Sequence, residues 1–111
     1  METLETVIKA KEFLLSKKGE EIVILDMRSL SGITDYYLIA TGTSIPHIKA
    51  LANALERSLK EEGLRPHRKA GIPESEWMAI DYINFIVHLF SSQTRQYYDI
   101  ERLWNDAVRV D

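Results

Sequence analysis

The segment Trp77 to Phe90 has the sequence WMAIDYINFIVHLF, and it decides the fold. Each half has the length and the β-branched or aromatic content of a strand, and Tyr82 to Asn84 separates the halves, so the segment predicts a β-hairpin. Because side chains alternate along a strand, Trp77 and Asp81 are expected on one face and Tyr82 on the other. Both faces are largely apolar, which places the hairpin near the middle of a sheet.

Composition indicates one ordinary globular domain spanning residues 1–111, with 45% apolar and 28% charged residues. The chain has no cysteine, which excludes a disulfide framework and a thiolate metal site and fits a reducing cytosol. It has no long apolar run and no basic leader, so we expect a cytoplasmic protein without a membrane span. The net charge of −3 argues against a broad basic face for nucleic acid.

Two amphipathic helices precede the hairpin. Apolar residues recur at helical spacing from about residue 3 to residue 18, and Gly19 is a suitable helix stop. A second helix is expected to begin after Ser44, a good N-cap, with Pro46 in its first turn. Its apolar residues form a narrow stripe as far as about Glu62, which predicts a helix lying on a sheet.

Shorter elements complete the prediction. Strands are expected at Ile22–Met27 (IVILDM) and Asp35–Thr41 (DYYLIAT), whereas Arg65–Lys69 (RPHRK) fits an edge strand or an exposed loop and Ala70–Glu76 fits a loop. A final short helix is predicted from inward-facing apolar residues at i, i+3, i+4 and i+7, namely Ile100, Leu103, Trp104 and Ala107. This order predicts an α+β (α/β-like) fold with a mixed sheet of four or five strands and helices packed on it, including room for one parallel pair.

Few residues are placed for catalysis. The Gly42-Thr43-Ser44 turn joins a strand to a helix, as phosphate-binding turns do, but it lacks the Lys and spacing of a P-loop, so a helix cap is the simpler interpretation. Asp26, Asp35 and Asp81 occur singly, whereas two-metal nucleotidyl transfer needs carboxylates close together. The histidines show no metal-ligand spacing, and His88 is expected to be a histidine with satisfied hydrogen bonds in the core or at an interface. We therefore expect no enzyme activity, metal or cofactor, and keep a nucleotidyltransferase-like nucleotide-binding enzyme as the alternative.

Aromatic residues gather in the last third of the chain, at Trp77, Tyr82, Tyr97, Tyr98 and Trp104. Carboxylates stand among them, at Asp81, Asp99 and Glu101. Aromatics mixed with carboxylates fit a surface for a basic protein patch. Core packing is the alternative, which stays open for Trp77 and Tyr97 and is favoured for Trp104.

RNA binding is a third possibility. It would use a short basic cluster formed by Arg65, His67, Arg68 and Lys69, and it predicts a steep salt dependence.

Four runs of sequence carry a resemblance to a known family. They are LDMRSLSGITDYYLIATGTS (25–44), W-x-x-x-D-Y (77–82), FIVHLF (85–90) and RQYYDIERLW (95–104). In this order and spacing they resemble the ribosomal silencing factor family, also called Iojap-like, from about Val7 to Ala107. The resemblance implies a fold similar to the nucleotidyltransferase sheet without its catalytic carboxylates.

The same resemblance implies a function. Members bind the large ribosomal subunit through its fourteenth protein, a component of an intersubunit bridge, and so block joining of the small subunit and repress translation when nutrients run short. Self-association is known in the family, so a homodimer is expected when the partner is absent. By position, the partner surface implied by the resemblance falls on Trp77, Asp81, Tyr82, Tyr97, Tyr98 and Asp99.

The chain departs from the family pattern at three places. Ile83-Asn84 replaces the usual Gly-Asp at the hairpin turn, which leaves the turn type open. Ile45-Pro46-His47 stands where an Arg often follows the Gly-Thr-Ser turn, and Ala70 replaces the acid that usually precedes the loop glycine.

Overall fold

The hairpin expected from WMAIDYINFIVHLF is present in the computed structural model, which describes residues 3–30 and 32–110. Strands β4 (Trp77–Asp81) and β5 (Phe85–Phe90) pair antiparallel, with Trp77 opposite Phe90 and Ile80 opposite Val87. Both are interior strands of a sheet ordered β3-β4-β5-β2-β1-β6. The interior position explains why both faces of the hairpin are apolar, because each face is covered by other parts of the chain.

The remaining strands are β1 (Glu20–Asp26), β2 (Tyr36–Thr41), β3 (Arg68–Ile72) and β6 (Val108–Val110). Strands β2 and β5 pair in parallel, and every other pairing is antiparallel. The predicted mixed sheet with one parallel pair is therefore confirmed. The predicted number of strands is wrong, because the sheet has six strands and four or five were expected.

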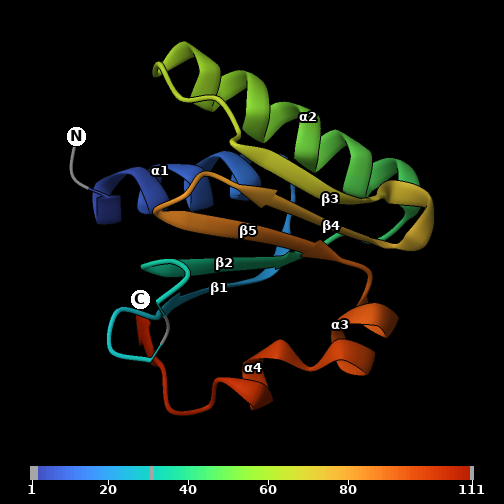
Figure 1. The fold of residues 1–111 in the computed structure, drawn as a ribbon. Helices are drawn as coiled ribbons and strands as arrows, with labels where there is room; N and C mark the ends of the chain where they lie inside the picture. The colour runs from blue at the N-terminus through green and yellow to red at the C-terminus, as the bar shows by residue number, and fades with distance from the viewer. Residues whose placement is uncertain (1–2, 31, 111) are drawn as a thin grey trace.

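The helices are α1 (Thr3–Ser16), α2 (Ile45–Glu61), α3 (Ser92–Tyr98) and α4 (Ile100–Leu103), with one 3-10 turn, η1 (Pro73–Ser75). Figure 1 shows α1 and α2 along one side of the sheet and α3 and α4 along the other. Helix α2 begins as predicted, because the Ser44 hydroxyl accepts a hydrogen bond from the backbone N–H of His47 at 3.1 Å.

The main core lies between the sheet and helices α1 and α2. It contains apolar side chains from both helices and from one face of the hairpin, including Leu14, Leu51, Leu55, Ile80 and Val87. Fully burying a side chain of this size stabilises the fold by roughly 1.5–3 kcal/mol. A smaller cluster lies on the opposite face of the sheet, where parts of the C-terminal segment pack.

Three local predictions were wrong. Ala70 to Ile72 belong to β3 instead of a loop, and Val108 to Val110 form a strand that was not expected. Both strands exist because each pairs with a neighbouring strand, β3 with β4 and β6 with β1, and a local sequence pattern does not reveal such pairing. Leu103 was expected to face inward but is 71% exposed, because α4 is only one turn long.

The hairpin turn has an unusual backbone. Ile83 has a φ of 73°, and the N–H of Asn84 donates to the carbonyl of Tyr82 at 2.9 Å, which makes a γ-turn. A β-branched residue is strained at positive φ, so neighbouring side chains must hold it. Asp81 accepts from the N–H of Ile83 at 2.7 Å, and the Thr34 hydroxyl donates to the Ile83 carbonyl at 3.1 Å.

Among the described residues, no helix is long and apolar enough to cross a membrane.

Candidate functional site

The start of β4 and helix α3 are tied together by hydrogen bonds, although they are far apart in the sequence. The carbonyl of Glu76, directly before β4, accepts from the Thr94 hydroxyl at 2.6 Å and from the backbone N–H of Ser91 at 3.1 Å. Ser91 also caps α3, since its hydroxyl accepts from the N–H of Thr94 at 3.2 Å. These contacts bring Trp77 beside the aromatic residues of α3.

Trp77 is half-buried and has both a packing and a surface role. Its ring lies 6.0 Å from the ring of Tyr98, measured between centroids, and it packs against the smaller apolar cluster that includes Phe90. Its indole N–H donates to Nδ1 of His88 at 3.4 Å. Trp77 can therefore serve both core packing and an interface, because part of its ring packs against neighbouring side chains while the rest reaches the surface.

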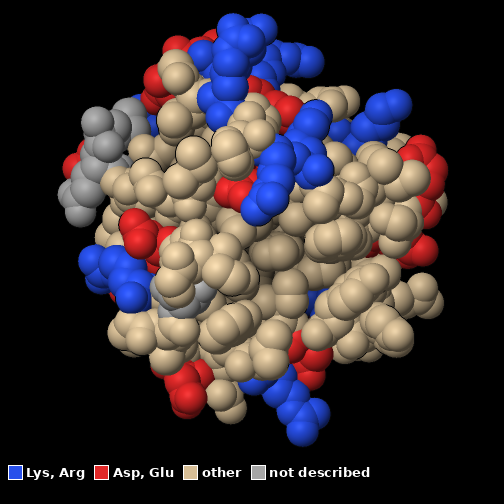
Figure 2. Space-filling model, in the orientation of Figure 1, with Lys and Arg blue, Asp and Glu red and all other residues tan. Residues whose placement is uncertain are grey.

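Tyr97 and Tyr98 are the most exposed aromatic side chains of the described residues, at 82% and 53%. Their rings contact each other edge to face with centroids 5.2 Å apart. We call Trp77, Tyr97 and Tyr98 the aromatic surface. Figure 2 shows a mainly uncharged area in the lower half of the molecule, with both acidic and basic side chains at its margins and the largest group of Lys and Arg at the top.

A buried arginine fixes α3 and α4 to the sheet. Arg95 is 9% exposed; its Nη1 donates to the Thr41 hydroxyl at 2.9 Å, and its Nε donates to the Glu101 carboxylate at 2.7 Å. This hydrogen bond lowers the pKa of Glu101. This role could not be predicted from the sequence, because Thr41 lies 54 positions from Arg95. The clamp keeps the aromatic surface in a fixed orientation.

The predicted carboxylates are less available than expected. Asp81 is engaged by the backbone of Ile83 and by Nε of Arg68, at 3.4 Å. Glu101 is engaged by Arg95. Asp99 lies between α3 and α4 in a left-handed conformation, with a φ of 49°, and no ion pair of its carboxylate occurs among the described residues. Asp99 is therefore the acidic group of the predicted set best placed to meet a partner.

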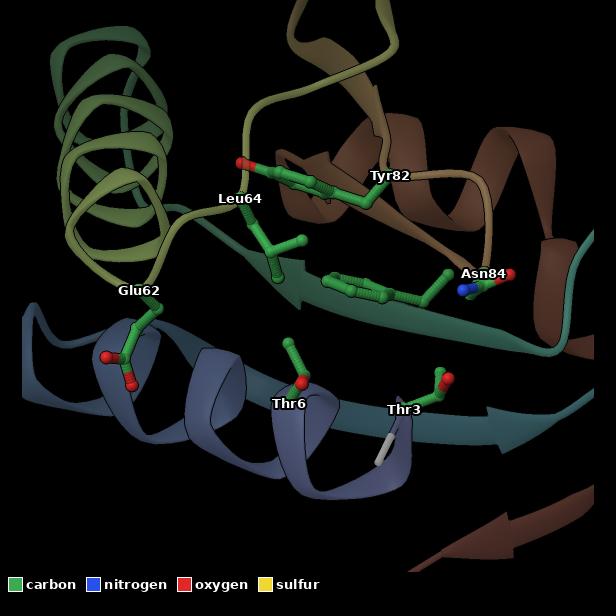
Figure 3. A pocket seen from close by; sticks show the side chains of 7 residues that line it. Thr3, Thr6, Glu62, Leu64, Tyr82 and Asn84 are labelled. Atoms are coloured by element: carbon green, nitrogen blue, oxygen red, sulfur yellow. The ribbon is translucent and has the colours of Figure 1, made fainter. Parts of the chain in front are cut away.

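Tyr82 is separated from the other predicted residues. It is 6% exposed and lies on the opposite face of the hairpin, in the main core, with its ring stacked on Phe85 at 5.0 Å between centroids. Tyr82 lines a hollow of about 210 Å³ together with Thr6 and Leu64, and Figure 3 shows its ring on one side of this hollow and Thr6 on the other. Burial raises the pKa of its hydroxyl. Tyr82 is therefore not part of the aromatic surface.

His88 is in the core, as predicted, and behind Trp77, but, contrary to expectation, its hydrogen bonding is not fully satisfied. It is 8% exposed, its ring meets the Tyr37 ring edge to face at 4.9 Å, and its Nε2 has no hydrogen-bond partner among the described residues. Burial lowers the pKa of its imidazole to about 4, so the ring is neutral near pH 7. In the neutral ring Nδ1 accepts from Trp77, so the proton is assigned to Nε2.

The Gly42-Thr43-Ser44 turn is used as a helix cap. The N–H of Thr43 donates to Nδ1 of His47 at 2.9 Å, while Ser44 accepts from the His47 backbone. A hollow of about 400 Å³ lies beside the turn, but its charged lining residues are two carboxylates, Glu20 and Glu76. Two acids repel a phosphate, so this hollow does not favour a nucleotide. Among the described residues, no group of three or more His, Asp or Glu side chains could hold a metal.

We expect Gly71→Ala to disturb Trp77. Gly71 has a φ of 74°, and a Cβ there would lie 2.8 Å from Cε3 of Trp77 and would also collide with the Trp77 carbonyl oxygen. The substitution should lower the free energy of unfolding by about 2 kcal/mol or more and shift the tryptophan emission. Gly63→Ala is the matched control, because Gly63 has a φ of 87° but open space around it, so it should show only the smaller cost of the backbone conformation. Equal losses in the two variants would contradict the predicted collision.

Fold and site together define a class: a small α+β domain that presents aromatic side chains at the margin of a rigid mixed sheet. The family model described as ribosomal silencing factor during starvation matches residues 1–111, and the chain belongs to that family. The family resemblance found in the sequence is thereby confirmed. Membership gives the chain a ribosome-associated silencing role in the regulation of translation.

Individual relatives agree with this assignment. The chain is 34% identical over 110 residues to the ribosomal silencing factor of Halalkalibacterium halodurans, covering 99% of this chain and 92% of that protein. A crystal structure of a protein from Chromobacterium violaceum is similar with a TM-score of 0.90 and 37% identity, covering 95% of this chain and 88% of that chain. A mouse (Mus musculus) relative, named mitochondrial assembly of ribosomal large subunit protein 1, is 29% identical over 94 residues, covering 82% of this chain and 41% of that protein.

Proposed function

We propose that this protein binds the large ribosomal subunit through the subunit's fourteenth protein and prevents the small subunit from joining, so that translation is repressed. Family membership supports a ribosomal partner, and the name of the mouse relative refers to the large subunit. The proposed site of action is the cytoplasm, on free large subunits. No covalent step is required.

The aromatic surface is the observation that carries the proposal. Tyr and Trp are the residues that most often dominate binding energy at protein interfaces, because their rings bury a large area with few rotatable bonds. Trp77, Tyr97 and Tyr98 lie together at the margin of the sheet and are held by Glu76 and Arg95 from behind. Asp99 would add a carboxylate beside them for a basic group of the partner.

Steric exclusion follows from the size of the domain. Its extents are 34 × 33 × 24 Å. Two subunits that pack against each other leave no space of this size between their contacting surfaces. A body of this size bound to a bridge protein would occupy the space that the small subunit must enter.

Sucrose-gradient cosedimentation with isolated subunits tests the proposal. The protein should migrate with the large subunit and not with the small one, and adding it before mixing should reduce the joined particle. Unchanged subunit joining at saturating protein would refute steric exclusion. Calorimetry with ATP and Mg²⁺ should give no heat of binding, and a micromolar affinity would instead favour the nucleotide-binding alternative.

Replacing Tyr97 with alanine should weaken binding to the large subunit by about 10-fold or more without lowering stability. The ring is 82% exposed, so its removal leaves little cavity in the folded protein, whereas a tyrosine that is a hot spot of an interface contributes about 2 kcal/mol or more to binding. Leu15→Ala is the control, since Leu15 is 52% exposed on α1, away from the aromatic surface. Equal affinities of the two variants would remove Tyr97 from the interface.

We also propose that the free protein forms a homodimer through the aromatic surface. Exposed aromatic side chains tend to self-associate when no partner covers them. Light scattering should then show a dimer for the wild type and a monomer for Tyr97→Ala. A dimer that survives this substitution would place self-association elsewhere.

A further inference from the structure

A group of basic side chains lies outside the aromatic surface, where α2 ends and the chain turns toward β3. Arg57 and Lys60 stand one turn apart on α2, and Arg65 follows in the connecting segment. All three are exposed and line one open hollow of about 410 Å³ together with Glu56 and Pro66. We call Arg57, Lys60 and Arg65 the basic ridge. Figure 2 shows Lys and Arg concentrated at this end of the molecule.

The basic ridge is unusual in a chain of net charge −3. Residues 56–69 contain five Lys and Arg residues and three Glu residues, and two of these carboxylates are already paired. Glu56 accepts from Lys69 at 3.2 Å, and Glu62 forms an ion pair with Lys9 of α1. The ridge cations themselves make no ion pair within residues 3–30 and 32–110. Of the three carboxylates in this segment, only Glu61 has no ion pair among those residues. The hollow itself is lined by three cations and one carboxylate, Glu56, which is paired with Lys69, so it has an excess of positive charge.

The basic ridge can reach the same partner as the aromatic surface. Arg68 pairs with Asp81 at one end of the β3–β4 ladder, and Ile72 pairs with Trp77 at the other. Four residues of strand separate the two ends by about 13 Å. The ridge adjoins the Arg68 end but lies on the α2 side of the sheet, opposite α3 (Figure 1), so only a partner as large as a ribosomal subunit, extending around the edge of the domain, can contact both features.

We propose that the basic ridge binds the phosphate backbone of ribosomal RNA on the large subunit, at a second contact separate from the protein contact of the aromatic surface. This inference rests on the proposed function and adds ribosomal RNA as a second binding partner on the same subunit. Flexible cations around an open hollow without an aromatic side chain suit phosphates better than a protein surface, which needs apolar anchors. The contact gives orientation and affinity without sequence readout.

The energetic signature of such a contact is its salt dependence. Each phosphate that a Lys or Arg neutralises releases condensed counterions, so the slope of log affinity against log salt becomes steeper by about 1 per contact. Three ridge contacts therefore predict a slope that is steeper by roughly 2–3 than the slope of a variant without the ridge.

The experiment compares two triple variants in binding to large subunits at a series of salt concentrations. In the ridge variant Arg57, Lys60 and Arg65 become Gln. In the control, Lys11, Lys17 and Lys18 become Gln; they lie around the C-terminal end of α1, near the start of α2, and the change in net charge is the same. Thermal unfolding confirms that both variants are folded. A second measurement uses a mixed-sequence RNA duplex at low salt, with polyglutamate as the competing polyanion.

The ridge variant should lose about 2–3 units of slope, while the control keeps the wild-type slope and both still block subunit joining at low salt. Wild-type slopes in both variants would overturn the RNA contact but leave the proposed function standing. Binding to polyglutamate as tight as binding to RNA would replace RNA with an acidic protein partner. Absence of wild-type binding to the large subunit would overturn the proposed function and this inference together.

Discussion

Replacing Trp77 with alanine should weaken binding to the large ribosomal subunit by 30-fold or more and lower the free energy of unfolding by about 2 kcal/mol or more. Both effects are expected because the ring packs against Phe90 and Tyr98 while it also reaches the surface. Sedimentation binding and chemical denaturation measure the two effects separately. Binding is measured at a temperature where circular dichroism shows the variant to be folded.

Trp104→Ala is the matched control for this experiment. Trp104 is also half-buried and packs in the same cluster, where its ring meets Tyr37 at 6.4 Å between centroids. It lies outside the aromatic surface, so its removal should cost stability but little affinity. A folded Trp77→Ala protein that binds as tightly as the wild type would show that Trp77 is not the anchor.

Acid should destabilise the protein through His88 by about 3 kcal/mol. The folded-state pKa of about 4 lies below the ordinary value of 6.5, because the imidazole is buried. As the pH falls, the unfolded chain takes up the proton first, so stability is lost from about pH 6.5 downward and the loss levels off below about pH 4. Denaturation at pH 7 and at about pH 5 should already reveal about half of this loss.

His88→Leu should remove this part of the pH dependence, because leucine does not titrate. His67→Gln is the control, since His67 is exposed. The lowered pKa values of Asp26, which accepts hydrogen bonds from Arg28, and of Glu101 add a separate loss at lower pH, where carboxylates take up protons. Comparing the variants above about pH 5 therefore isolates the histidine. A wild-type pH dependence in His88→Leu would exclude this explanation.

The candidate site could be predicted in part from the sequence. The aromatic and acidic residues of the last third were recognised as a group, and the structure brings Trp77, Tyr98 and Tyr97 together. Alternation along the strand had already placed Tyr82 on the other face, and its burial there removes it from the group. The clamp of Arg95 was not predictable, because hydrogen bonds over long sequence separations leave no periodic signal.

The sequence by itself determined the hairpin, the first two helices, the Ser44 cap and the mixed sheet. Each depends on local propensity or on periodic burial, which neighbouring residues report. Only the tertiary structure decided the two short strands, the engagement of Asp81 and Glu101, and the excess charge of the basic ridge. These depend on which distant segments pack together, because a strand of three residues or an isolated charge is defined by its partners.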